Sequence, residues 1–152
     1  QNRSQWNQDY IQKGIEFLEK ATKGAFINEF YLQATISGLH CEAKAYNETK
    51  WSDILELYDT LIRLNPSPMV KLNRIVALGK AKSPSDALTE LKQLETNPQL
   101  ENHYPVYAIK GEFLVESGNI EEGKQATLKA ISLTNNTAEK QYLQRKLALL
   151  PE

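Results

Sequence analysis

The sequence is poor in the residue types that carry chemistry, with one cysteine and two histidines among 152 residues. A single cysteine, Cys41, excludes an internal disulfide, which favours a reducing compartment, and we expect a cytoplasmic protein. His40 and Cys41 are adjacent and diverge by about 100° on a helix, while His103 lies far away, so no zinc-ligand spacing is present. The seven glycines form no phosphate-binding loop. We therefore expect neither a metal nor a cofactor.

Long apolar runs and an excess of positive charge are also missing. No stretch approaches the roughly 18 apolar residues of a membrane-spanning helix, and no charged-then-apolar leader opens the chain. The formal net charge is -1, whereas phosphate neutralisation needs a surplus of Lys and Arg, so direct nucleic-acid binding is not expected. Only the tail, with Lys140, Arg145 and Lys146, is basic, and cations at a helix C-terminus explain that more simply. The missing initiator Met suggests a fragment of a longer protein.

Acidic pairs provide no sign of catalysis. Glu121 and Glu122, and likewise Asp86 and Glu90, fall in the first or second turns of expected helices, where the helix dipole favours negative charge. Cys41 has no base near it in the sequence and is better explained as a small buried apolar residue. We expect a non-enzymatic protein.

Apolar residues recur at helical spacing along almost the whole chain, and no period-two alternation is bounded by hairpin turns. The pattern predicts an all-α fold of about eight antiparallel helices. Cap residues and helix-breaking residues predict where each helix begins and ends. The first four expected segments are a helix capped by Ser4 and ending at Gly24, one over 28–46, one capped by Thr49 and stopped at 65–68, and one from Pro68 or Met69. The last four are one after Ser83-Pro84, one from Tyr104 to Gly118, one from Asn119, and one after Asn136, where Glu139 closes a capping box.

The stretch 104–136 resembles a tetratricopeptide repeat. Tyr107 stands at the first aromatic position, Gly111 where the two helices touch, and Gly123 and Ala130 at the small positions of the second helix. A bulky side chain at these small positions would force the helices apart. Trp51 and Tyr58 are expected to pack in a less regular unit, and residues 137–150 to form a capping helix. The resemblance implies one TPR-like domain over 1–152, a right-handed superhelical array.

Asn73 and Arg74 stand out inside the apolar stretch LNRIVAL. An arginine there needs a partner, which is either an internal carboxylate or carbonyl, or an external group at an interface. The inner positions of the clearest repeat hold Ala108, Ile109 and Glu112. These side chains argue against the carboxylate-gripping kind of tetratricopeptide adaptor, which uses Asn and Lys there.

Several stretches together resemble the C-terminal helical-repeat extension of bacterial extracytoplasmic-function (ECF) RNA polymerase sigma factors. In order, they are QNRSQWN at 1–7, YLQATISGLHCEA at 31–43, WSDILELYDTLIRLNPSPMVKLNRIVALG at 51–79, the repeat from Tyr104, and AEKQYLQRKLALL at 138–150. The first stretch departs from the family pattern, because Asn2 and Asn7 replace aspartates and Gln5 stands where an apolar residue is common.

The resemblance implies a regulatory domain whose partners are the upstream sigma regions and RNA polymerase. The DNA-binding regions would then lie before Gln1. Candidate interdomain or partner contacts are Arg3, Trp6, Tyr31, His40, Asn73 and Arg74. Two alternatives stay open: a freestanding TPR-like adaptor that binds a peptide or protein in its concave groove, and an enzyme or small-ligand sensor that uses the same groove. The sequence does not set the oligomeric state.

Overall fold

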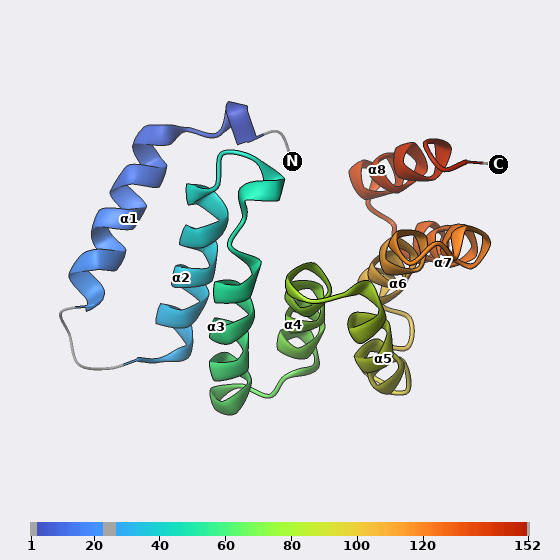
Figure 1. Cartoon of the computed structure of the whole chain (residues 1–152), viewed down its shortest axis with the longest axis horizontal. Coiled ribbons are helices and arrows are strands. Elements are labelled where there is room, and N and C mark those ends of the chain that lie inside the picture. The colour runs from blue at the N-terminus through green and yellow to red at the C-terminus, as the bar shows by residue number, and fades with distance from the viewer. Residues whose placement is uncertain (1–2, 23–26, 152) are drawn as a thin grey trace. The chain divides into compact units, whose positions relative to one another are not determined.

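The computed structural model describes residues 3–22 and 27–151, apart from the side chains of Ser4 and Thr22. Every regular element in those ranges is helical, which confirms the all-α prediction (Figure 1). Two short 3-10 turns, η1 (Arg3–Gln5) and η2 (Tyr46–Glu48), accompany the α-helices. The α-helices are α1 (Gln8–Thr22), α2 (Glu29–Glu42), α3 (Trp51–Leu64), α4 (Pro68–Ala81), α5 (Pro84–Glu95), α6 (Tyr104–Glu116), α7 (Ile120–Leu133) and α8 (Thr137–Ala148).

The first helix begins later than predicted. Ser4 belongs to η1, and α1 starts at Gln8 behind Asn7, whose Oδ1 accepts a hydrogen bond of 3.1 Å from the Tyr10 amide. Asn7 is as good a cap as serine and stands directly before the helix, so the predicted start at Ser4 is wrong. The predicted end at Gly24 lies outside the described residues.

The connection between α2 and α3 also differs from the prediction. Helix α2 begins directly after Asn28, close to the predicted start, and the Asn28 side chain caps it. The predicted end at residue 46 is wrong, since α2 ends at Glu42 because Ala43 adopts an extended backbone, with φ -70° and ψ 118°. Thr49 was expected to cap α3. Lys50 occupies that position without a side-chain bond, and the Thr49 hydroxyl instead accepts a bond from Arg3. The Thr49 hydroxyl, which the sequence pattern predicts as the cap of α3, therefore bonds the guanidinium of Arg3, 46 positions away in the chain.

The capping box predicted for α8 forms only in part. Asn136 Oδ1 accepts from the amides of Ala138 and Glu139 at 2.9 and 3.3 Å, as expected of a cap. The Glu139 carboxylate does not return to the Asn136 amide. It accepts from the Thr134 hydroxyl at 2.6 Å, and Thr134 Oγ1 in turn accepts from the Asn136 amide at 3.2 Å. The Thr134 hydroxyl therefore bridges the Glu139 carboxylate and the Asn136 amide, which bond each other directly in a complete capping box.

The chain divides into two compact units within α4, between Lys71 and Leu72. In the N-terminal unit, α2 packs against both α1 and α3, and the three helices lie side by side (Figure 1). Its buried apolar residues come mainly from α2 and α3 and include Leu32, Ile36, Ile54, Leu55 and Leu61.

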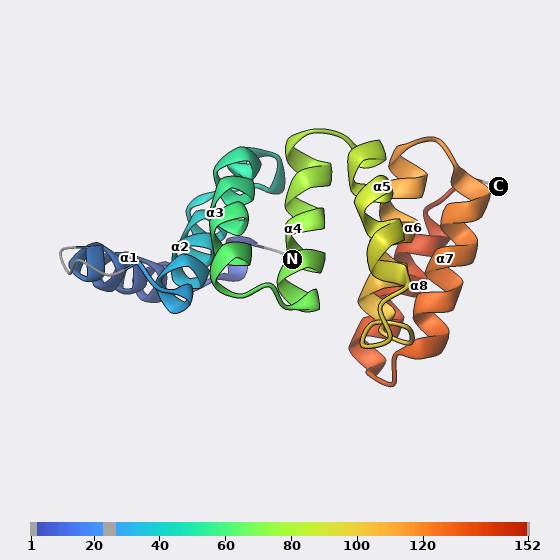
Figure 2. The same cartoon turned by 90° about the horizontal axis from the view of Figure 1, so that it is seen from below.

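The C-terminal unit is built on successive helix pairs. Helix α6 packs against α5 and α7, and α7 packs against α8 (Figure 2). One buried cluster joins α4, α5 and α6 and consists of Leu72, Ile75, Ala87, Leu91, Leu94, Leu100, Val106 and Phe113.

Helices α6 and α7 approach closely at two glycines. A Cβ atom on Gly111 would lie 2.5 Å from Thr127 Oγ1 and 3.0 Å from the Gly123 carbonyl oxygen, and one on Gly123 would lie 2.5 Å from Val115 Cγ2. The structure therefore places Gly111 and Gly123 at the helix contact, where the repeat resemblance puts them. Ala130 of α7 is fully buried.

A third close approach involves Gly79, which the sequence pattern did not single out. A Cβ atom there would overlap the edge of the Phe113 ring and lie 2.9 Å from Ala87 Cβ. Phe113 is only 1% exposed. Gly79 thus leaves room for the largest buried side chain of the unit.

Gly111→Ala should destabilise the C-terminal unit by about 1–3 kcal/mol, because the added methyl meets backbone of α7 and the two helices must separate. Gly14→Ala is the matched control, since nothing lies within 4 Å of a Cβ atom at Gly14 in α1. That change should stabilise by about 0.5–1 kcal/mol through helix propensity alone. Urea unfolding followed by far-UV circular dichroism measures both. A Gly111→Ala protein as stable as the parent would contradict the close contact.

Candidate interaction site

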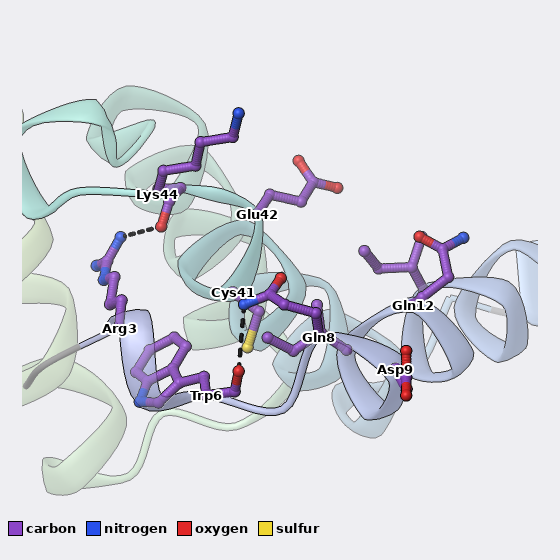
Figure 3. A pocket seen from close by; sticks show the side chains of 11 residues that line it. Arg3, Trp6, Gln8, Asp9, Gln12, Cys41, Glu42 and Lys44 are labelled. Carbon is purple, nitrogen blue, oxygen red and sulfur yellow. Dashed lines mark hydrogen bonds between the residues drawn. The ribbon is translucent and has the colours of Figure 1, made fainter.

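Arg3 binds the connection between α2 and α3 with three hydrogen bonds. Its Nη1 donates to the carbonyl oxygens of Ala43 at 2.8 Å and Ala45 at 3.1 Å, and Nη2 donates to Thr49 Oγ1 at 3.0 Å. Figure 3 shows the bond to Ala43. The guanidinium also lies 5.6 Å from the centre of the Trp6 ring. We name this arrangement the Arg3 clamp. It gives the Ala43 carbonyl oxygen a donor, adds a second donor to the Ala45 carbonyl oxygen, which also accepts from the Glu48 amide, and joins η1 to the α2–α3 connection.

An aromatic cluster lies on the same connection. The Trp51 ring makes edge contacts with His40, at 5.3 Å between centroids, and with Tyr46, at 5.5 Å. Burial lowers the pKa of His40, and the positive charge of Arg3 lowers it further. The imidazole is therefore neutral at neutral pH.

A hollow of about 730 Å³ lies beside the clamp, between η1, α1 and the end of α2 (Figure 3). Ile11, Ile15 and Cys41 form the apolar walls, and the charged lining residues include both positive and negative side chains. No histidine is among the residues that line the hollow. The complete lining is Arg3, Trp6, Gln8, Asp9, Ile11, Gln12, Ile15, Cys41, Glu42, Ala43 and Lys44.

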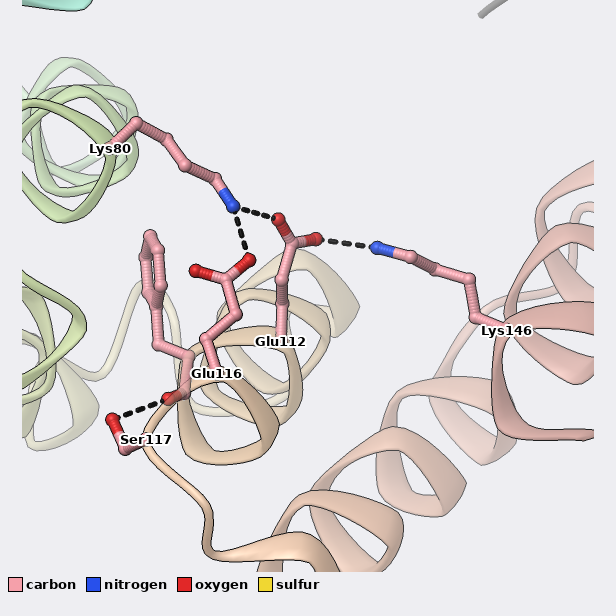
Figure 4. Close-up of polar contacts among 6 residues, drawn as sticks. Lys80, Glu112, Glu116, Ser117 and Lys146 are labelled. Carbon is pink, nitrogen blue, oxygen red and sulfur yellow. Dashed lines mark hydrogen bonds and ion pairs between the residues drawn. The ribbon is translucent and has the colours of Figure 1, made fainter. Parts of the chain in front are cut away.

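In the C-terminal unit, four charged side chains of α4, α6 and α8 form a connected network (Figure 4). Lys80 Nζ pairs with Glu112 Oε1 at 2.7 Å and with the Glu116 carboxylate, while Lys146 Nζ pairs with Glu112 Oε2 at 2.6 Å. Only 11% of the Lys80 side chain is exposed, and its ammonium lies 5.2 Å from the Phe113 ring centre. The network joins α4, α6 and α8.

The ion pairs of this network determine the direction in which the pKa values of Glu112 and Lys146 are shifted. Burial by itself raises the pKa of the Glu112 carboxyl, but hydrogen bonds and charges from Lys146 and Lys80 outweigh burial and leave that pKa below its usual value. Burial likewise opposes the charge of Lys146, and the bond to Glu112 reverses the effect, so the pKa of Lys146 is raised. Glu112 and Lys146 are therefore both charged at neutral pH.

The structure separates the six candidate contact residues. Arg3, Trp6 and His40 come together around the clamp, and Tyr31 is half-buried on α2. Arg74 lies in the other unit, where Nη1 pairs with Glu90 Oε2 at 2.6 Å, so it has the internal carboxylate that was one of its two expected partners. Asn73 beside it is exposed.

Aromatic residues expected at repeat-packing positions have mixed surroundings. Tyr58 is half-buried, and burial raises the pKa of its hydroxyl. The Tyr107 hydroxyl donates to the Glu101 carbonyl at 3.0 Å, and the Lys129 ammonium lies 5.8 Å from its ring centre. Trp51 belongs to the aromatic cluster beside the clamp.

Sequence reasoning missed the role of Lys80 and gave Lys146 only a dipole role. Lys80 stands at the end of an apolar stretch, where nothing in the spacing indicates a buried ion pair. Glu112 was noted as an inner position, but its partners are 32 and 34 residues away in the chain. Only the fold brings them together.

Over residues 3–22 and 27–151, no three His, Cys, Asp or Glu side chains are grouped so that they could hold a metal ion. No helix in these ranges is long and apolar enough to cross a membrane.

The sequence is similar to an uncharacterized protein of Rhizobium meliloti (strain 1021), with 32% identity over 147 residues. The alignment covers 97% of this chain and 34% of that protein, so the chain spans about a third of the relative's length. No family model matches the chain. No solved structure matches it either.

Arg3→Ala should lower the unfolding free energy of the N-terminal unit by about 1–3 kcal/mol, because the buried Ala43 carbonyl and the buried Thr49 hydroxyl lose a donor, whereas the Ala45 carbonyl keeps the Glu48 amide. Both tryptophans of the chain, Trp6 and Trp51, lie in this unit, so tryptophan fluorescence during urea unfolding reports on it selectively. Arg63→Ala is the control, because Arg63 is exposed and bonds the Thr60 hydroxyl of its own helix. Equal unfolding midpoints for the two variants would contradict the clamp.

The N-terminal unit should lose stability as the pH falls from about 7.5 to about 5.5. The native pKa of His40 lies below the unfolded value of 6.5, so between the two pKa values the unfolded chain binds a proton that the folded chain does not. His40→Gln should therefore show a smaller loss by the same fluorescence measurement. His103 is present in both proteins and is therefore not a difference between them. The same pH dependence in both would refute the assignment.

Proposed function

We propose that this chain is the C-terminal regulatory domain of an ECF-type RNA polymerase sigma factor. In this role it has no enzymatic activity. It contacts the upstream sigma regions or RNA polymerase and thereby modulates transcription initiation. The proposal rests on the ordered motifs of the sequence together with one structural observation.

That observation is the meeting of three family-like stretches at the Arg3 clamp. Arg3 and Trp6 come from the first stretch, Ala43 ends the second, and Trp51 begins the third. Residues 40 or more positions apart in the chain are thus joined by direct bonds, since Arg3 and Ala43 are separated by 40. Stretches that resemble one family in sequence also form one site in space, which supports treating them as a unit.

The clamp also suggests how an upstream region would be held. Because Arg3 is bonded to the α2–α3 connection, a segment that enters the domain at Arg3 leaves from a defined place on the N-terminal unit. The sigma regions would then be positioned by the clamp rather than by a loose linker. In the same proposal, the helix pair α6–α7 with its two facing glycines is one TPR-like repeat of a right-handed superhelical array.

The adaptor alternative has less support. A groove that binds a partner's carboxylate needs cations on the inner helices that the partner can reach. Lys80 and Lys146 are already paired with Glu112 and Glu116, so a partner would have to displace an internal carboxylate. These pairs are partly exposed, so the displacement opposes binding but costs less than breaking a fully buried ion pair.

In vitro transcription with the complete reading frame tests the proposal. The intact protein is compared with a version that ends before Gln1, with Arg3→Ala, and with Arg63→Ala as the control. We expect the deletion and Arg3→Ala to change promoter-dependent transcription or polymerase binding, and Arg63→Ala to leave both unchanged. An upstream reading frame without sigma regions would overturn the proposal, as would identical activity of the intact and shortened proteins.

A further inference from the structure

Helix α1 presents two apolar faces, of which only one is used. Ile11, Ile15 and Leu18 are half-buried on the side that packs against α2. A Cβ atom on Gly38 of α2 would lie 3.4 Å from Leu18 Cδ2, which is ordinary contact distance. This face is sufficient to hold α1 in the N-terminal unit.

The second face, which we name the α1 stripe, consists of Tyr10, Gly14, Phe17 and Ala21. Tyr10 is 72% exposed and Phe17 70% exposed, and the small residues between and after them are exposed as well. The four positions are separated by four, three and four residues, which is the a/d spacing along which a second helix packs. Two large aromatic rings in one open row are unusual on a surface without a partner.

Positive charge borders the α1 stripe. Lys13 and Lys20 each stand three residues after one of the aromatic residues, and their ammonium groups lie 6.0 Å from the Tyr10 ring centre and 5.5 Å from the Phe17 ring centre. Neither lysine forms an ion pair with a carboxylate among the described residues. Asp9 and Glu16 of α1 lie farther round the helix, beyond the lysines.

The bordering charge distinguishes between possible occupants. A second copy of α1 packed antiparallel on the stripe would bring Lys13 and Lys20 of both copies to the same border, and like charges there oppose pairing. A helix with acidic residues beside its apolar row would instead pair with these lysines.

We infer that the α1 stripe docks an amphipathic helix of a partner protein, with aliphatic residues at its a and d positions and Glu or Asp beside them. The aromatic rings would pack between the aliphatic side chains, while the lysines would turn from the rings to the acidic residues. This inference does not depend on the sigma-factor proposal, because it concerns a different surface from the Arg3 clamp.

Binding of a designed peptide tests the inference. The probe is a fluorescein-labelled three-heptad peptide with Leu at a and d and Glu at e and g, whose own pairing is opposed by glutamate repulsion. The comparison peptide carries Lys in place of every Glu. Fluorescence anisotropy with the 152-residue chain should show binding of the acidic peptide at least about tenfold tighter than of the basic one, a preference that weakens as salt is added.

Variants of the stripe and its border sharpen the test. Tyr10→Ser combined with Phe17→Ser should weaken binding of the acidic peptide at least about tenfold. Lys13→Glu combined with Lys20→Glu should reverse the preference toward the basic peptide. Tyr142→Ser is the matched control, because Tyr142 of α8 is also an exposed ring, 51% exposed, with a lysine ammonium 5.4 Å from its centre. It should leave binding unchanged.

Every side chain substituted in these variants is exposed at the surface, so the variants should fold, and circular dichroism verifies this. Three results would overturn the inference. They are no binding of the acidic peptide, the same affinity after the Tyr10 and Phe17 substitutions, and a dimer of the parent chain in light scattering that Tyr10→Ser with Phe17→Ser abolishes. The last result would assign the stripe to a second copy.

Discussion

Close approach of helix backbones is the constraint on which the C-terminal unit depends. At Gly111 and Gly123 the backbones of α6 and α7 leave no room for even a methyl group, and at Gly79 the missing side chain makes space for the Phe113 ring. Phe113 then completes the buried cluster that joins α4, α5 and α6. Because α4 and α6 are so close, Lys80, next to Gly79, reaches both Glu112 and Glu116. The charged network is a consequence of the packing.

The N-terminal unit solves a different physical problem. Its helices α2 and α3 are joined by a connection with an extended residue and a 3-10 turn, whose polar groups lie outside the hydrogen-bond pattern of either α-helix. A planar guanidinium with several donors can reach more than one acceptor at once, and Arg3 bonds two carbonyl oxygens and a hydroxyl of this connection. Lysine, with a compact charge and no fork of donors, is a poor substitute. The first residues of the described chain are therefore part of the fold rather than a loose end.

Three features of the described residues bear on the proposed function. The Arg3 clamp joins η1 to the α2–α3 connection, the network of Lys80, Glu112, Glu116 and Lys146 links α4, α6 and α8, and the α1 stripe leaves an apolar row exposed. Under the proposed function, such features hold and contact other protein segments. Helical arrays commonly act in this way, since stacked helices present extended faces to partners.

The sequence by itself determined the helices, most of their ends, and the small residues at the α6–α7 contact. Those features depend on neighbours within a few positions: apolar spacing, prolines and cap residues, and the small-residue pattern of one repeat. It could not determine the partner of Thr49, the buried pairing of Lys80, or the choice between an internal and an external partner for Arg74. In each case a charged or polar group is satisfied by an atom far away in the chain. Only the tertiary structure decides such pairs, because hydrogen bonds and ion pairs depend on distance in space, which local sequence does not encode.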